Sequence, residues 1–250
     1  SNIAVEIACD KEETKNLLDA ASISVPKGYI VYDEEDLEDA IRKVGYPIVL
    51  KPVSGNHGRG ATINITNWAD AQEALVAAKR VSRGVICERF ITGYDFRLLV
   101  INYKLVAAAK RTPAAVTGDG KQTIQELINE VNKDPRRGYG HEKVLTAIKV
   151  DEMTLNILKE KNLTLETVLA DGQIVYLKST ANLSTGGTAT DITDLVHPHN
   201  VSMAERIARI VGLDICGIDI MAPDLTSPIK ENGGAILEVN AGPGFRMHIA

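Results

Sequence analysis

An acid and an amide stand two positions apart in the segment AILEVN, which otherwise has the composition of a buried strand. Side chains two residues apart point to the same side of a strand, so Glu238 and Asn240 share a face. A carboxylate rarely stays buried without a partner, because the loss of its hydration is costly unless charge or hydrogen bonds replace it. We therefore expect a positive group at this face.

Asp219 is a second acidic residue in an apolar segment, CGIDIM. The isoleucines on either side of it point one way and Asp219 the other, so it joins Glu238 and Asn240 if the two strands pair. Two carboxylates and an amide, with room for water and phosphate oxygens, favour Mg²⁺ over zinc or iron. The alternative is a salt bridge from Asp219 to Lys178 or Arg97.

Lys51 ends an apolar strand directly before the loop PVSGNHGRG. Glycines of this loop, which include Gly58 and Gly60, let backbone amides approach an anion, and a lysine beside such a loop is a usual phosphate partner. The spacing matches neither a P-loop nor a dinucleotide-binding fingerprint. The alternative is a lysine whose apolar stem covers the strand end and whose ammonium group remains in water.

The stretch TGDGKQT, residues 117–123, also contains glycine, lysine and threonine. Their spacing is wrong for a Walker A motif. We interpret this stretch as a turn followed by a helix cap.

Short apolar strands and helices alternate along the chain, and these elements must position the candidate residues. The segment DFRLLVINYKLVAAAKR predicts a hairpin that turns at Asn102 and Tyr103. Apolar residues at helical spacing predict helices near residues 10–20, 33–45, 68–80, 124–132, 152–159 and 201–211. Hairpins interspersed with helices favour an α+β layered fold in two subdomains, residues 1–91 and 92–250.

The composition excludes several classes of function. The 28 basic and 33 acidic residues give a net charge of -5, which offers no general field for nucleic acid or an anionic membrane. The apolar stretches are much shorter than a membrane span, and the sequence does not begin with a signal pattern. We expect a cytoplasmic enzyme or binding protein.

Taken in chain order, these motifs resemble the ATP-grasp carboxylate–amine ligases across nearly the whole sequence. The resemblance implies an ATP-grasp fold that holds ATP between two α+β subdomains, with ATP and Mg²⁺ as cofactors. It implies that Asp219, Glu238 and Asn240 are the metal ligands. It also implies that Lys11, in the helix that begins with DK, and Lys51 bind phosphates.

The segment CERFITGYDFR resembles the linker strand that holds the adenine in this family. By this resemblance Glu88 and the backbone of Arg89, Phe90 and Ile91 face the adenine. Asp95 would bind the ribose hydroxyls.

One position departs from the family pattern. In the D-alanine ligase branch an arginine stands two residues before the first metal carboxylate, and the residue here is Gly217. The cation that stabilises the transition state must therefore come from another position. The candidates are Arg97, Arg111 and Lys178.

The segments YLKSTANLSTGGTATDITD and NAGPGFRMH most closely resemble the ATP-grasp ligases that extend a storage polymer of aspartate and arginine. The resemblance implies a polymer primer and aspartate as substrates, contacted by Asn182, Ser184, Thr185 and Arg246. It also implies a fragment of a larger, homo-oligomeric multidomain enzyme with a C-terminal Mur-ligase-like domain. A glutathione-synthesising ATP-grasp ligase and a nucleotide-binding module without chemistry are the alternatives.

Overall fold

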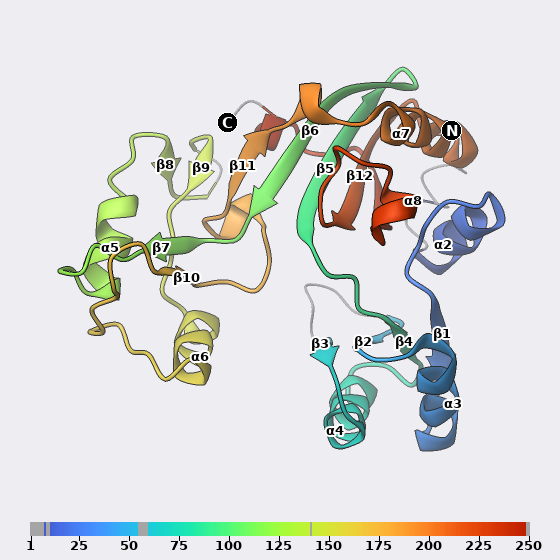
Figure 1. Ribbon diagram of the computed structural model, residues 1–250, viewed down its shortest axis with the longest axis horizontal. Coiled ribbons are helices and arrows are strands. Elements are labelled where there is room, and N and C mark those ends of the chain that lie inside the picture. The colour runs from blue at the N-terminus through green and yellow to red at the C-terminus, as the bar shows by residue number, and fades with distance from the viewer. Residues whose placement is uncertain (1–7, 9–10, 55–59, 141, 249–250) are drawn as a thin grey trace.

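Apolar side chains gather in three hydrophobic clusters, each built on its own sheet (Figure 1). The computed structural model describes residue 8 and residues 11–54, 60–140 and 142–248. The expected boundary between residues 91 and 92 falls between the first sheet and the second. The part from residue 92 onward contains most of the cluster on the second sheet and all of the third cluster, and the cluster on the second sheet also includes residues 8, 18 and 23.

The first sheet is antiparallel and carries Lys51 and Glu88. Its strands lie in the order β1 (Gly28–Val31), β4 (Val85–Arg89), β2 (Ile48–Pro52) and β3 (Thr62–Ile65). Two helices pack against it, α3 (Glu34–Val44) and α4 (Trp68–Lys79). Each begins at a side-chain cap, Asp33 for α3 and Asn67 for α4, which accepts a hydrogen bond from a first-turn amide.

The second sheet is the central one and carries the acidic residues at 95, 219 and 238. Its strands lie in the order β11 (Thr188–Asp191), β6 (Lys104–Thr112), β5 (Tyr94–Ile101), β12 (Ile215–Ala222) and β13 (Ala235–Ala241). Helices α2 (Lys11–Ala20) and α7 (Pro198–Val211) pack on the face that bears Phe96, Leu98 and Ile218. Residues 95, 97 and 219 alternate with those core residues and therefore project from the opposite face.

The third cluster belongs to a lobe inserted between β6 and β11, shown in green and yellow in Figure 1. Its elements are β7 (Ala115–Thr117), α5 (Ile124–Val131), β8 (Arg137–Gly138), β9 (Leu145–Thr146), α6 (Glu152–Glu160) and β10 (Ile174–Tyr176). Strands β7 and β10 pair antiparallel, and β8 and β9 pair parallel. Short helices complete the described chain: η1 (Leu183–Thr185), η2 (Thr193–Leu195), α8 (Ile229–Asn232) and η3 (Arg246–His248).

Two local predictions are confirmed. The β5–β6 hairpin turns at Asn102 and Tyr103, whose φ values are 51° and 59°. Residues 117–123 form a turn and a cap, because Asp119 accepts hydrogen bonds from the amides of Lys121 and Gln122 and Thr123 caps α5. None of the helices in the described part of the chain has the length and apolar character that crossing a membrane requires.

Candidate active site

Paired arginine and aspartate side chains form a network on the face of the central sheet that α2 and α7 leave uncovered. In the strand register Asp219 is opposite Arg97, and Asp95 is opposite Arg111. Arg97 donates to both carboxylate oxygens of Asp219, with Nη2 2.9 Å from Oδ2. Arg111 Nη2 lies 2.5 Å from Asp95 Oδ1 and 3.4 Å from Asp219 Oδ1, so the two pairs form one network.

This network is largely shielded from water. Arg97, Arg111 and Asp219 are each less than a tenth exposed. Burial raises the pKa of Asp95, and the charge of Arg111 opposes that rise. Removal of one partner from a buried ion pair typically costs about 3–5 kcal/mol, so each member depends on the others.

Gly217 provides the space through which Arg97 reaches Asp219. A Cβ atom at position 217 would lie 2.9 Å from Arg97 Nη1 and 2.8 Å from the Cβ of Pro243. The position at which the D-alanine ligase branch has an arginine is therefore covered here by the guanidinium of Arg97. Of the three candidate cations, the structure brings Arg97 and Arg111 to Asp219.

Lys178, the third candidate cation, lies in different surroundings. Its ammonium group is buried, 2.5 Å from Asp151 Oδ2 and 2.9 Å from Thr154 Oγ1. Asp151 is also the N-cap of α6. The described contacts of Lys178 therefore attach the end of β10 to α6 within the inserted lobe, and the salt bridge to Asp219 is made by Arg97 instead.

The proposed metal ligands lie side by side on β12 and β13. Asp219 is in register with Glu238, and Asn240 Nδ2 is 3.4 Å from Asp219 Oδ2. A β-bulge follows this pair, because Ile220 pairs with Ile236 and Leu237 has no partner on β12. Bulges are frequent beside active sites, where they redirect side chains.

Two carboxylates and an amide offer oxygen donors, which suit Mg²⁺. Among the described residues, no group of three or more histidine, cysteine, aspartate or glutamate side chains is placed to hold a metal ion. A site of this kind would therefore need oxygen atoms from water or phosphate to complete it. Asp219, Glu238 and Asn240 stay a prediction as metal ligands.

Glu88 on β4 lies between two lysines. Lys51 Nζ on β2 is 2.5 Å from Glu88 Oε1, and Lys15 Nζ on α2 contacts Oε2. Burial opposes the ionisation of Glu88, but Lys51 and Lys15 outweigh it, so the pKa of Glu88 is lowered. Burial lowers the pKa of Lys15 as well, against the opposing charge of Glu88. Two ammonium groups beside one carboxylate leave a local positive charge that suits a phosphate.

Lys15 was not predicted as a site residue. The family resemblance indicated Lys11, whose backbone is in α2 but whose side chain lies outside the described structure. Lys15 is one helical turn further along α2, and its side chain is only 18% exposed where it reaches Glu88. Residues four apart share a helix face, so the spacing of Lys11 and Lys15 is the signal that could have identified it.

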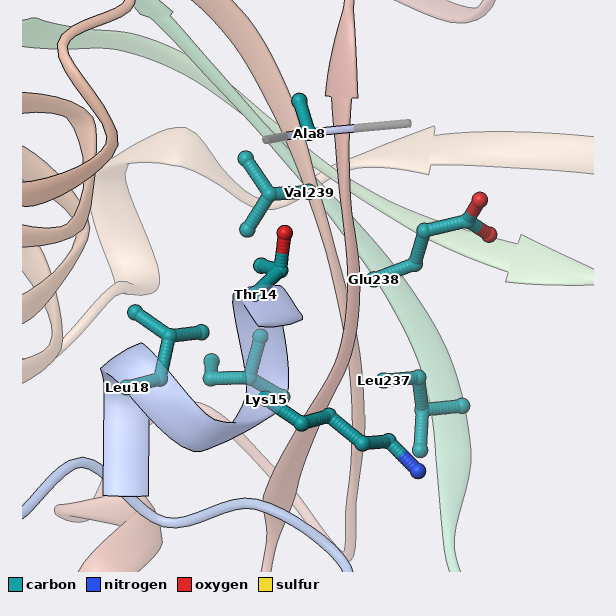
Figure 2. A pocket seen from close by; sticks show the side chains of 8 residues that line it. Ala8, Thr14, Lys15, Leu18, Leu237, Glu238 and Val239 are labelled. Carbon is teal, nitrogen blue, oxygen red and sulfur yellow. The ribbon is translucent and has the colours of Figure 1, made fainter. Parts of the chain in front are cut away.

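A pocket between α2 and β13 connects this lysine with the face of Glu238 (Figure 2). Thr14, Lys15 and Leu18 line it from α2, and residues 236–239 line it from β13. In Figure 2 the ammonium end of Lys15 and the carboxylate of Glu238 project to the same side of β13, whereas Val239 projects to the other. Lys15 therefore contacts Glu88 and also lines the pocket that Glu238 borders.

The expected adenine linker connects the first sheet to the central sheet. The amide of Arg89 donates to Lys27 O at 2.8 Å, and the amide of Phe90 donates to Pro47 O at 3.0 Å. The guanidinium of Arg89 donates to Val44 O at 3.1 Å, at the C-terminal end of α3. These contacts hold the linker in place, with Phe90 and Ile91 half-buried between the two sheets.

The loop expected to contact substrate includes η1 and is anchored at both sides. The carbonyl oxygen of Asn182 accepts hydrogen bonds from Thr185 Oγ1 at 3.0 Å and from the amide of Gly187 at 3.1 Å. Arg137 Nη1 donates to Gly186 O at 2.9 Å from the inserted lobe. Ser184 and Asn182 are exposed, so this anchored loop presents polar side chains to solvent.

Two further predicted residues fall outside the described structure in whole or in part. Gly58 lies in the undescribed segment, and Arg246 begins η3 but its side chain is not described. Gly60 is described and has φ +71°, a conformation that favours glycine.

Comparisons with known proteins agree with this arrangement. Residues 8–125 match the family described as the RimK-like ATP-grasp domain. The crystal structure of a bifunctional glutathione synthetase from Pasteurella multocida superposes with a TM-score of 0.74 and 33% identity. That superposition covers 100% of this chain and 35% of the other. The chain has the ATP-grasp fold.

Curated relatives of this ATP-grasp domain are longer than the chain. The chain is 57% identical over 251 residues to the cyanophycin synthetase of Crocosphaera subtropica. The aligned region covers 99% of this chain and 29% of that protein. The chain is 36% identical over 252 residues to the glutathione biosynthesis bifunctional protein of Clostridium perfringens, with 99% of the chain and 32% of that protein covered. The chain therefore spans about a third or less of the relatives it matches.

The comparisons confirm the resemblance to the ATP-grasp ligases and the α+β ATP-grasp fold. ATP and Mg²⁺ are the cofactors of these ligases, and the residues present fit both. The cluster of Lys15, Lys51 and Glu88 has the charge to hold a nucleotide phosphate. Asp219 and Glu238 are in register and offer carboxylate oxygens of the kind that Mg²⁺ prefers, although both oxygens of Asp219 accept hydrogen bonds from Arg97 here.

Proposed function

We propose that this ATP-grasp domain joins a carboxylate to an amine at the expense of ATP. The carboxylate is the C-terminal group of a cyanophycin primer, a polymer of aspartate and arginine, and the amine is that of aspartate. One observation carries the proposal: Arg97 and Arg111 meet Asp219 on the same sheet face that carries Glu238. The 57% identity to a cyanophycin synthetase over 99% of the chain supports the choice of substrates.

A free carboxylate resists attack by an amine, because its charge is delocalised over both oxygens and oxide is a very poor leaving group. Transfer of the γ-phosphoryl group of ATP to a carboxylate oxygen solves both problems. The resulting acyl phosphate has an open carbonyl carbon and a phosphate leaving group. Attack by the amine then forms the C–N bond, breaks the C–O bond to phosphate and gives the amide.

Lys15 and Lys51 bind the phosphates of ATP in this proposal, with Lys11 as a further candidate on the same helix face. The linker at residues 89–91 holds the adenine, and Asp95 binds the ribose. Glu88, which the family resemblance placed at the adenine, pairs with the two lysines. Asp219, Glu238 and Asn240 would hold Mg²⁺, which would compensate the charge of the transferred phosphoryl group. All other steps rely on the side chains of this chain.

Arg97 and Arg111 stabilise the negative charge that develops on the carbonyl oxygen during amine attack. Both guanidinium groups are buried and already fixed by hydrogen bonds to Asp219 and Asp95. Donors that are oriented before the reaction lose little free energy to reorganisation, and removal of one such donor typically costs about 100–1,000-fold in turnover. Lys178, which is bound to α6, has a structural role in the proposal.

Asn182, Ser184, Thr185 and Arg246 contact the primer or aspartate in this proposal. The exposure of the η1 loop and its anchoring by Arg137 support that role. A homo-oligomeric enzyme with a C-terminal Mur-ligase-like domain stays a prediction from the family resemblance.

The test is primer extension by the full-length protein. A short synthetic aspartate–arginine primer is incubated with MgATP and aspartate, without arginine, and the products are weighed by mass spectrometry. We expect a gain of one aspartyl unit and no more, because the next backbone addition requires an arginine-capped end. Failure to add aspartate to the primer would contradict the proposal.

A second candidate is a glutathione-type ligase, favoured by the 36% identity to the bifunctional protein of Clostridium perfringens and the TM-score of 0.74 to the Pasteurella multocida enzyme. It would use a γ-glutamylcysteine carboxylate and glycine. The same assay with this pair separates the candidates, because turnover of γ-glutamylcysteine and glycine without primer extension would favour the second.

A further inference from the structure

His248 lies at the edge of the arginine network, and the proposed roles above do not use it. It ends η3, which packs against β6 and β11 on the central sheet. Its backbone amide donates to Phe245 O at 2.9 Å. Its Nε2 atom is buried and has no hydrogen-bond partner among the described residues. A buried polar atom without a partner is uncommon and calls for an explanation.

Three charged groups act electrostatically on the His248 side chain. Arg97 on β5 and Arg111 on β6 are positive, and Asp191 on β11 is negative. Burial lowers the pKa of His248, and the two arginines add to this effect while Asp191 opposes it. The imidazole is therefore neutral at neutral pH and has a lone pair with which it can accept a proton.

The proposed reaction requires such a proton acceptor. An amino acid carries its amine as ammonium at neutral pH, and the nitrogen must lose a proton to attack and a second one to become an amide. Arg97 and Arg111 cannot accept it, since guanidinium is always protonated in proteins. The carboxylates of Asp95 and Asp219 are held in ion pairs with these arginines.

We propose that His248 is the general base that accepts a proton from the attacking amine. This inference rests on the proposed function. The amine nitrogen forms a bond to the acyl carbon, the C–O bond to phosphate breaks and phosphate leaves with the electron pair. One proton of the nitrogen passes to the imidazole of His248, which later releases it to water, and the other passes to the departing phosphate. The helix η3 packs against β6, the strand that carries Arg111, and the charges of Arg97 and Arg111 both act on the imidazole.

Hydroxylamine separates the activation of the carboxylate from the deprotonation of the amine. It is neutral at neutral pH and traps an acyl phosphate as a hydroxamate without help from a base. The full-length protein is supplied with MgATP, the aspartate–arginine primer and either aspartate or hydroxylamine. The variant is His248→Gln, and His199→Gln on the exposed surface of α7 is the matched control.

We expect His248→Gln to lower the ratio of amide to hydroxamate formed by about 100-fold, the lower end of the usual contribution of a general base. His199→Gln should keep the wild-type ratio. An unchanged ratio in His248→Gln, with both products made, would overturn the role of His248 but leave the proposed function intact. If the wild-type protein makes neither product, the proposed function fails and the assignment of His248 fails with it.

A second measurement needs no substitution. NMR titration of the imidazole signals in the wild-type protein should show that His248 titrates below 6.5, its ordinary value. The amide-forming rate of the wild type should fall as the pH drops through the same midpoint, since the protonated imidazole cannot accept a proton. A midpoint at or above 6.5, or an amide rate that does not follow it, would overturn the proposal.

Discussion

Replacement of Gly217 by alanine tests whether Arg97 depends on the space beside Asp219. The added Cβ would lie 2.9 Å from Arg97 Nη1, 3.1 Å from its Cδ and 2.8 Å from the Cβ of Pro243. Pro243 is buried and its ring cannot rotate away, so the guanidinium of Arg97 is the group that can move. We expect the alanine to displace Arg97 and to weaken its two hydrogen bonds to Asp219.

The size of the effect follows from these contacts. Overpacking of a buried site costs about 1–3 kcal/mol, and loss of one partner of a buried ion pair costs about 3–5 kcal/mol. Asp219 still has Arg111 at 3.4 Å, so we expect Gly217→Ala to lower the free energy of unfolding by only about 3 kcal/mol in total. For a domain of this size that corresponds to a fall in melting temperature of about 6–12 °C. Displacement of an oxyanion donor should also lower turnover about 100-fold.

The measurements are thermal melting and ADP release in the full-length protein, with Gly244→Ala as the matched control. A Cβ at position 244 would meet nothing within 4 Å, so this variant should behave as the wild type. If Gly217→Ala has the same melting temperature and the same rate of ADP release as Gly244→Ala, the position of Arg97 does not depend on a glycine at 217. That result would refute the reasoning.

Three further predictions concern the lysine cluster and β13. Glu88→Gln should lower the free energy of unfolding by about 2 kcal/mol at neutral pH. This is less than the usual range for a buried ion pair, because the side chain of Lys51 is 30% exposed. Folding lowers the pKa of Glu88, so the ionised carboxylate stabilises the protein above pH 4.5. This stabilisation is lost as the pH falls through the pKa of Glu88 in the folded protein. Urea unfolding should show the variant and wild type converging in acid, and a constant gap would contradict this. Lys15→Ala should weaken a non-hydrolysable ATP analogue by about ten-fold or more in calorimetry. Lys121→Ala, in the exposed turn, should leave that affinity unchanged, and equal losses would place the phosphates elsewhere. Glu238→Ala should abolish the part of the ATP-dependent thermal shift that requires Mg²⁺, and an unchanged shift would remove Glu238 from the metal site.

The elements that carry the site were predictable because their patterns are local. The apolar residues of CGIDIM and AILEVN indicated two buried strands, and the structure pairs them with Asp219 in register with Glu238. The Asn102–Tyr103 turn followed from its position between two apolar runs of similar length. In each case the sequence spacing alone determines which side chains share a face.

Other elements could not be predicted, because their stability comes from contacts distant in the sequence. Strand β11 is composed of threonine, alanine and aspartate and has no apolar pattern of its own. It is a strand because its backbone pairs with β6. Lys178 follows a strand and has the same appearance in the sequence as a site lysine, but its partners Asp151 and Thr154 are more than twenty residues away.

The Lys11 and Lys15 pair shows a different limit of sequence reasoning. Both lysines lie on one face of α2, so helical periodicity cannot distinguish between them. The choice depends on the distance from each lysine to Glu88, the carboxylate that Lys15 contacts. That distance is set by packing of α2 against β13, which joins segments more than two hundred residues apart.

Gly217 and Arg97 are best understood as one unit. The missing arginine at position 217 predicted that a cation must come from elsewhere, but three candidates remained open. The choice was made by strand order: β5 lies directly beside β12, and Arg97 is in register with Asp219. The guanidinium can cross position 217 only because no side chain is there. A chain with both a side chain at 217 and an arginine at 97 would be overpacked by that same contact, so the two positions should vary together.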